Sequence, residues 1–197
     1  GRGHEVVIWA REPEIEESIS RDHRNPSYLP DVRLPESVKC TTVLSKALQG
    51  ADLVVFATPS HTLREMARRC KQWMTGGEIV VSVAKGLEKK TFLRMSQVLS
   101  ETLADVLDPS RVAVLSGPSH AEEVALNKPT TVVAASVSEE VALKVQEIFL
   151  TPMFRVYVNH DLVGVEIAAA VKNIMAIAAG IVEGAGMGDN AIAALIT

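Results

Sequence analysis

Short apolar segments rich in valine and isoleucine alternate with helical segments along most of the chain. The segments predicted as strands are 4–10, 53–57, 78–84, 111–115, 130–135 and 154–158. Those predicted as helices are 44–48, 62–73, 91–103, 121–126 and 139–149. Strands that are apolar on both faces and alternate with helices form a parallel sheet with helices on both sides. The pattern therefore predicts a doubly wound α/β fold.

The composition changes after Asn159, where β-branched residues give way to alanine, glycine and isoleucine at helical spacing. The segment 161–180 is apolar almost all round and contains no proline, so it is predicted to be one long interior helix. We therefore expect an α/β domain over 1–159 and the start of an all-helical domain over 160–197. The apolar pattern stops abruptly at Thr197, so we expect a fragment that lacks both ends.

The glycine fingerprint of dinucleotide-binding folds, G-x-G-x-x-G after a first strand, is not found. Gly1-Arg2-Gly3 does not fit it, because no strand precedes it. We expect the first strand and its glycine loop upstream of Gly1, which makes 4–10 the second strand. That strand ends at Arg11 and Glu12. Arg11 would suit the ribose 2′-phosphate of NADP, whereas Glu12 is compatible with NAD. The alternative is that the two residues form a solvated surface pair with no ligand.

Polar residues follow the later strands, at the edge where open α/β sheets bind ligands. Lys85-Gly86 follows 78–84, and Ser119 follows 111–115. Ser119 with Glu122 also fits a helix capping box, which is a purely structural role. The long helix carries Lys172 and Asn173. A lysine in an apolar helix needs a partner or a function, although a snorkelling side chain would explain it too.

A second acid on this helix, Glu166, lies seven residues before Asn173 and so shares its face. A structural hydrogen bond on this shared face would explain an acid in an apolar helix.

Composition excludes several other classes of function. The net charge is −4 and no block of lysine and arginine stands out, so we expect no nucleic-acid partner. The apolar run 174–181 is far shorter than the roughly 20 residues of a membrane span. Cys40 and Cys70 fit neither a metal site nor a disulfide framework, so we expect no metal. With no signal peptide visible, the expected location is cytoplasmic.

Several segments together resemble the bacterial-type NAD(P)-dependent glycerol-3-phosphate dehydrogenases, in order and at the family's spacing. They are 24–30 (RNPSYLP), 84–86 (AKG), 115–124 (LSGPSHAEEV), 154–157 (FRVY), 164–166 (GVE), 172–173 (KN) and 188–190 (GDN). The resemblance implies a Rossmann-type domain joined to a helical domain. It also implies interconversion of dihydroxyacetone phosphate and sn-glycerol 3-phosphate with NAD or NADP, for phospholipid synthesis, and a homodimer.

The resemblance assigns roles to individual residues. It implies that Lys172 exchanges a proton with the C2 oxygen of the substrate and that Lys85 acts beside it. Implied substrate contacts are Lys85, Gly117, Ser119, Lys172 and Asn173, and implied dinucleotide contacts are Arg11, Tyr28, Lys85 and Ala121. The family's arginine-asparagine pair and a further substrate-site aspartate are not found in these residues.

Two alternatives stay open from the residues. Dehydrogenases of 6-phosphogluconate, hydroxyacyl thioesters or ketopantoate share the expected architecture, although the Ser-Gly-Pro-Ser segment at 116–119 argues against them. A non-catalytic nucleotide-binding module is the alternative of another class. Two lysines facing one crevice argue against that module, because a decayed site has no need of them.

Overall fold

The structure is a computed structural model that describes residues 3–197, so Gly1 and Arg2 of the first glycine-containing segment lie outside it. The strands are β1 (Val6–Trp9), β2 (Arg24–Asn25), β3 (Leu29–Arg33), β4 (Val38–Thr41), β5 (Leu53–Phe56), β6 (Ile79–Ser82), β7 (Val112–Ser116), β8 (Thr130–Ser136) and β9 (Phe154–Asn159). The α-helices are α1 (Pro13–Asp22), α2 (Leu44–Leu48), α3 (Leu63–Lys71), α4 (Met95–Leu103), α5 (Ala121–Ala125), α6 (Glu139–Phe149), α7 (Leu162–Gly184) and α8 (Asp189–Ile196). Each predicted strand and helix is present.

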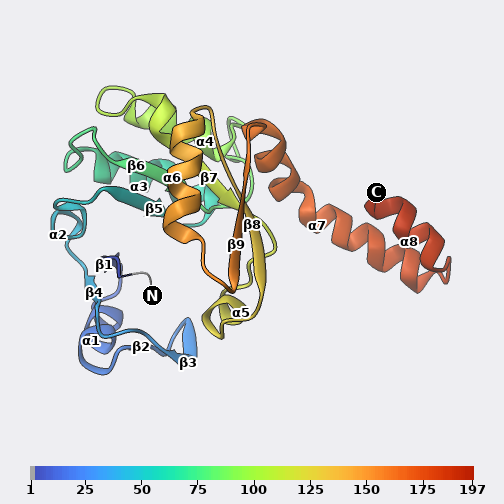
Figure 1. Ribbon diagram of the computed structural model, residues 1–197, viewed down its shortest axis with the longest axis horizontal. Helices are drawn as coiled ribbons and strands as arrows, with labels where there is room; N and C mark the ends of the chain where they lie inside the picture. The colour runs from blue at the N-terminus through green and yellow to red at the C-terminus, as the bar shows by residue number, and fades with distance from the viewer. Residues whose placement is uncertain (1–2) are drawn as a thin grey trace.

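A five-stranded sheet in the order β5-β6-β7-β8-β9 forms the centre of the molecule (Figure 1). The α/β class is confirmed, but the prediction of parallel pairing throughout is wrong at one place. β7 and β8 are antiparallel, with Ser116 opposite Val133, whereas the other neighbours in this sheet are parallel. A parallel return requires a crossover over the face of the sheet. The five-residue α5 instead stays beside β3, so β8 returns directly alongside β7.

β1 and β4 form a separate two-stranded parallel sheet. Within the described chain, β1 pairs with β4 alone and β5 with β6 alone, so each sheet has an open edge. Val6 and Val7 of β1 are 43% and 41% exposed, and Val55 of β5 is 41% exposed. Apolar strand residues belong in a covered sheet. Both sheets therefore present edges and faces that this chain leaves uncovered.

Helices cover both faces of the large sheet. Leu63, Leu99 and other side chains of α2, α3 and α4 pack against Phe56, Val80 and Val112 on one face. On the other face, Val141 and Val145 of α6 pack against alternate residues of the central strands. Alternate strand residues point to opposite faces, so both faces of these strands are apolar, as the sequence predicted.

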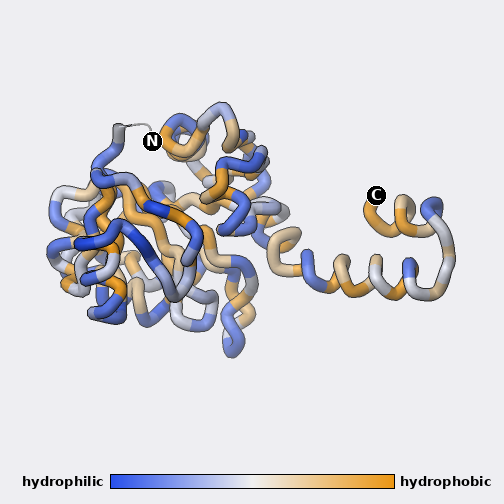
Figure 2. Tube along the Cα trace, turned by 90° about the horizontal axis from the view of Figure 1, so that it is seen from below, coloured by the Kyte–Doolittle hydropathy of each residue, from blue (hydrophilic) through white to orange (hydrophobic). Residues whose placement is uncertain are grey.

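α7 begins on the sheet and then leaves it. Asp161 accepts a hydrogen bond from the Gly164 N–H at 2.8 Å and so caps the helix. Leu162 and Val165 pack against the sheet at Val114 and Ala135. The rest of α7 projects from the main body, with α8 folded back beside it (Figures 1 and 2).

The expectation of an interior helix is therefore wrong for most of α7. Ile174, Ile177 and Ile181 are each nearly two-thirds exposed. The helix is also long and apolar enough to cross a membrane, judged by length and composition alone. Its apolar surface is exposed because, in residues 3–197, α8 is the only element that packs along its second half.

Candidate functional site

Lys85 lies at the carboxyl edge of the large sheet, three residues beyond the end of β6. Its ammonium group is partly buried and donates a hydrogen bond to Ser119 Oγ at 3.4 Å. Burial lowers the pKa of Lys85 below its usual value, and the positive charge of Lys172 lowers it further. Gly86 follows with φ of 122°, a conformation that side chains rarely adopt. The backbone therefore turns sharply directly after the lysine.

The turn after β7 brings Gly117 and Ser119 to the same edge. A Cβ atom on Gly117 would lie 2.7 Å from the Thr131 carbonyl oxygen and 2.8 Å from Val132 Cα, so only glycine fits there. The predicted capping box is wrong. His120 occupies the N-cap of α5, and the Ser119 hydroxyl donates to the Gly117 carbonyl oxygen at 3.4 Å. Because Ser119 lies one residue before the N-cap, its hydroxyl faces Lys85 instead of the helix.

Lys172 and Asn173 lie on α7 and are both exposed. The prediction of an interior helix is therefore wrong at Lys172, because α7 has left the sheet by this point. The structure brings Lys85, Gly117 and Ser119 together at the carboxyl edge. Lys172 is not in contact with them, and its positive charge contributes to the lowered pKa of Lys85.

Glu166 anchors α7, a role that the sequence alone did not reveal. Its carboxylate is only 7% exposed. It accepts hydrogen bonds from the Ser96 N–H at 2.8 Å, from Ser96 Oγ at 2.6 Å and from Arg94 Nη1 at 2.5 Å. Ser96 is in the first turn of α4, where free N–H groups and the helix dipole favour an anion. These hydrogen bonds run to Arg94 and Ser96, about seventy positions away, and not along the helix face shared with Asn173 that the sequence suggested.

The residues expected to contact a dinucleotide form a second group. Arg11 follows β1 and is mostly exposed, and its guanidinium donates to Glu12 Oε1 through Nε at 2.9 Å and Nη2 at 2.5 Å. Arg11 lowers the pKa of Glu12, to which a hydrogen bond from Tyr28 also contributes. Tyr28 is exposed and directly precedes β3, beside which α5 begins at Ala121. Arg11 and Tyr28 are therefore neighbours, with Ala121 on an adjacent element.

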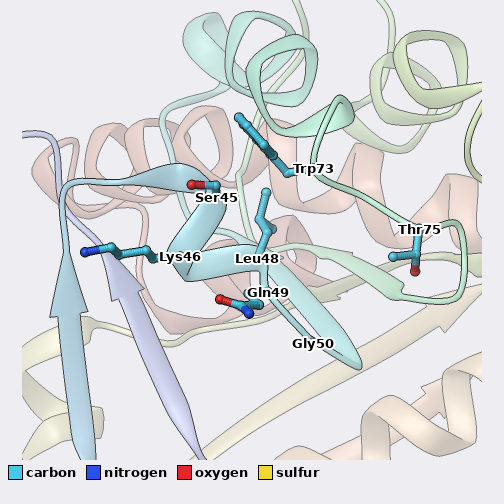
Figure 3. A pocket seen from close by; sticks show the side chains of 7 residues that line it. All are labelled: Ser45, Lys46, Leu48, Gln49, Gly50, Trp73 and Thr75. Carbon is cyan, nitrogen blue, oxygen red and sulfur yellow. The ribbon is translucent and has the colours of Figure 1, made fainter.

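A surface pocket lies at the opposite edge of the sheet (Figure 3). Its lining residues come from α2 and from the turn after α3, and they are Ser45, Lys46, Leu48, Gln49, Gly50, Trp73 and Thr75. These segments lead into the amino ends of β5 and β6. Open α/β sheets bind ligands at the carboxyl ends of their strands. We therefore place the functional site at the two lysines and not at this pocket.

A comparison with protein families decides between the classes. A family model described as the N-terminus of NAD-dependent glycerol-3-phosphate dehydrogenase matches residues 1–142. The chain belongs to this dehydrogenase family. A second model, described as the C-terminus of the same enzymes, matches residues 161–197. The two matched ranges lie on either side of β9.

Individual relatives in the dehydrogenase family agree. The chain is 53% identical over 196 residues to the glycerol-3-phosphate dehydrogenase [NAD(P)+] of Chlorobium phaeobacteroides and spans 59% of that protein. The crystal structure of glycerol-3-phosphate dehydrogenase from Coxiella burnetii is 35% identical, has a TM-score of 0.85, and matches 99% of this chain and 58% of its own. That of Saccharomyces cerevisiae is 29% identical, with a TM-score of 0.84 over 96% of this chain and 57% of its own. The chain thus spans under two-thirds of these dehydrogenases.

Membership of the dehydrogenase family fits the geometry at the carboxyl edge. A lysine ammonium and a serine hydroxyl lie together there, a pair of groups suited to hydrogen bonding with an anion. In the part of the chain that the structure describes, no group of three or more histidine, cysteine, aspartate or glutamate side chains is placed to hold a metal ion.

Proposed function

We propose that a full-length enzyme containing this chain interconverts dihydroxyacetone phosphate and sn-glycerol 3-phosphate with NAD or NADP. The observation that carries the proposal is the contact of Lys85 with Ser119 at the carboxyl edge, in a chain of this family whose Lys172 lowers the pKa of Lys85. The product would supply the glycerol phosphate backbone of phospholipids. We assign the enzyme to the cytoplasm.

Lys172 is the proposed proton donor and acceptor. When bound, the nicotinamide supplies or accepts the hydride at substrate C2. An alkoxide develops at the C2 oxygen during reduction, and an ammonium group beside it stabilises that charge and then donates a proton. Lys172 is exposed in this chain, so its ammonium is free to meet a substrate.

Lys85 is proposed to contact both substrate and cofactor. Its lowered pKa follows first from burial and then from the second cation, and a bound anion would offset the effect of that cation by favouring the charged ammonium. Gly117 and Ser119 would hold the substrate from the β7 turn, and Asn173 from α7. The hydroxyl of Ser119 already accepts a hydrogen bond from Lys85, so the two side chains would approach a substrate from the same side.

Arg11, Tyr28 and Ala121 are the proposed dinucleotide contacts, together with Lys85. The fit rests on the exposed guanidinium of Arg11 at the end of β1 and on the phenol of Tyr28 close to it. An arginine at that strand end accommodates a ribose 2′-phosphate. A missing first strand would pair between the open edges of β1 and β5 and bring the glycine loop for the pyrophosphate.

We propose two domains, 1–159 and 160–197, the second continuing in the full-length enzyme. The Asp161 cap at the start of α7 and the change of family match between 142 and 161 support this boundary. The exposed apolar surface of α7 would then pack against protein, from the same chain or from a homodimer partner, and not against lipid. The buried ion pair of Glu166 supports this assignment, because it fixes the start of α7 to the α/β domain.

A substrate screen tests the proposal. A full-length enzyme containing this chain is expected to oxidise NADH or NADPH with dihydroxyacetone phosphate, and to be inactive with ketopantoate or 3-oxoacyl thioesters. In the reverse direction it should oxidise sn-glycerol 3-phosphate and leave 6-phosphogluconate unchanged. Absorbance of the reduced nicotinamide reports each reaction. Activity with one of the other substrates alone, or with none of them, would reject the proposal.

A further inference from the structure

One loop joins Lys85 to a residue that holds α7, the helix of Lys172. It runs from Lys85 to Arg94, between β6 and α4. Its two sides are held together by a bridge between Leu87 and Arg94 and by a hydrogen bond from the Glu88 N–H to the Leu93 carbonyl oxygen at 3.0 Å. This closed loop carries Lys85 at one end and the Glu166 partner Arg94 at the other.

The loop is fixed to the α/β domain through Glu88. Arg64 of α3 donates to both carboxylate oxygens of Glu88, through Nε at 2.7 Å and Nη2 at 2.9 Å. Thr91 Oγ1 donates to the same carboxylate at 2.5 Å. A bidentate arginine-carboxylate pair defines orientation as well as distance. The loop is thus a rigid part of the domain that carries Lys85.

The other contact of the loop is with α7. Arg94 and Ser96 bind the Glu166 carboxylate with three hydrogen bonds, and Arg94 Nη1 also donates to Ser96 Oγ at 3.1 Å. The side chain of Arg94 is 18% exposed and that of Glu166 is 7% exposed. Six residues separate Glu166 from Lys172 on one continuous helix, which is about 9 Å along the axis. The position of Glu166 therefore determines where Lys172 lies.

We propose that the Arg94-Ser96-Glu166 cluster is a positioning device that holds α7 at the loop, so that Lys172 faces Lys85. Leu162 and Val165 pack on the sheet through apolar contacts, which define neither the rotation nor the translation of the helix closely. Three directed hydrogen bonds to one buried carboxylate define both. The expected effect on turnover rests on the proposed function, but the geometry can be tested without it.

Cross-linking between the lysines tests the geometry. In a full-length enzyme containing this chain, a short amine-reactive reagent such as difluorodinitrobenzene should link Lys85 to Lys172, and mass spectrometry of the peptides gives the yield. Glu166→Ala should lower that yield several-fold, because α7 loses its anchor. The conservative Glu166→Gln keeps an acceptor for Ser96 and should restore most of the yield. Arg94→Ala removes the ion pair with Glu166 but keeps both hydrogen bonds from Ser96. It replaces Glu166→Ala as the test variant if that protein does not fold, and it should also lower the cross-link yield.

Glu78 provides the matched control. It is a buried carboxylate at the opposite edge of the sheet, 2% exposed, and it accepts hydrogen bonds from the Thr75 and Gly76 N–H groups at 2.8 and 2.9 Å. Glu78→Ala should lower the melting temperature as Glu166→Ala does, yet leave the cross-link unchanged. Equal cross-link yields in the Glu166→Ala, Arg94→Ala and wild-type proteins would overturn the proposal, whatever happens to stability.

Kinetics supply the second readout. Displacing a catalytic group by about 1 Å lowers kcat on the order of 10²-fold, so Glu166→Ala should lower kcat on this scale and leave the KM for the dinucleotide unchanged. An unchanged kcat in this variant would also overturn the proposal. If the wild type is inactive with dihydroxyacetone phosphate but the cross-link responds as expected, the proposed function fails and the positioning role stands.

Discussion

Lys85 donates a hydrogen bond to the Ser119 hydroxyl at 3.4 Å, although 34 positions separate them in the sequence. The two residues follow the neighbouring parallel strands β6 and β7, whose carboxyl ends meet at one edge of the sheet. Gly117 makes the contact possible, because the chain passes against β8 too closely for any side chain at that position. This edge, with Lys172 above it, is the basis of the predictions that follow.

Lys172→Ala should abolish turnover while the fold survives. A positioned general acid contributes on the order of 10²- to 10⁴-fold to kcat. The side chain is exposed, so its removal should leave the melting temperature nearly unchanged. Steady-state kinetics of a full-length enzyme with dihydroxyacetone phosphate measure the effect. Lys90→Ala, at another exposed lysine, is the control and should be active. A near-normal kcat for Lys172→Ala would refute its catalytic role.

Gly117→Ala should destabilise the protein and weaken substrate binding. The new methyl group would overlap the backbone of Thr131 and Val132, at a cost of about 1–3 kcal/mol in the free energy of unfolding. Gly180→Ala is the matched control. No atom lies within 4 Å of the added Cβ there, so it should stabilise α7 by up to about 1 kcal/mol. Urea unfolding compares the two variants, and equal stabilities would contradict the packing argument.

Glu88 should make stability depend on acidic pH. Hydrogen bonds from Arg64 and then Thr91 lower the pKa of Glu88 from 4.5 to about 2. The folded state binds this proton more weakly than the unfolded state, so the stabilisation is fully present above pH 4.5 and is lost as the pH falls toward 2.

Urea unfolding at pH 6 and pH 3 tests this dependence. Between these two pH values, Glu88→Gln should lose less stability than the wild type does. Glu5→Gln removes an exposed carboxylate and is the control. The same pH dependence in Glu88→Gln and the wild type would show that the Arg64 pair does not contribute to it.

Glu12→Ala should move cofactor preference toward NADP. The carboxylate of Glu12 accepts the hydrogen bonds of the Arg11 guanidinium, which would otherwise be available to a ribose 2′-phosphate. Without Glu12, the free guanidinium of Arg11 should raise kcat/KM for NADPH relative to NADH. Arg11→Ala should lower that ratio. Arg21→Ala, which removes another exposed and paired arginine, is the control and should leave the ratio unchanged. A fall in the ratio for Glu12→Ala would reject this role of the pair.

The sequence by itself determined the strands and helices of the large sheet. Hydrophobic periodicity is a local property, so it identified each strand and helix of the large sheet and the strand ends that carry Lys85 and Gly117. It also located the unusual polar residues of α7. Several motifs occurring together, in order along the chain, indicated the family.

Only the tertiary structure decided the features that depend on distant contacts. β8 runs antiparallel because α5 stays at the sheet edge, and neither segment encodes this alone. Glu166 is buried because Arg94 and Ser96 meet it from 72 and 70 positions away. Lys172 is exposed because, in residues 3–197, the later turns of α7 have no sheet beneath them. Burial and pairing are properties of the whole packed chain, which local pattern does not specify.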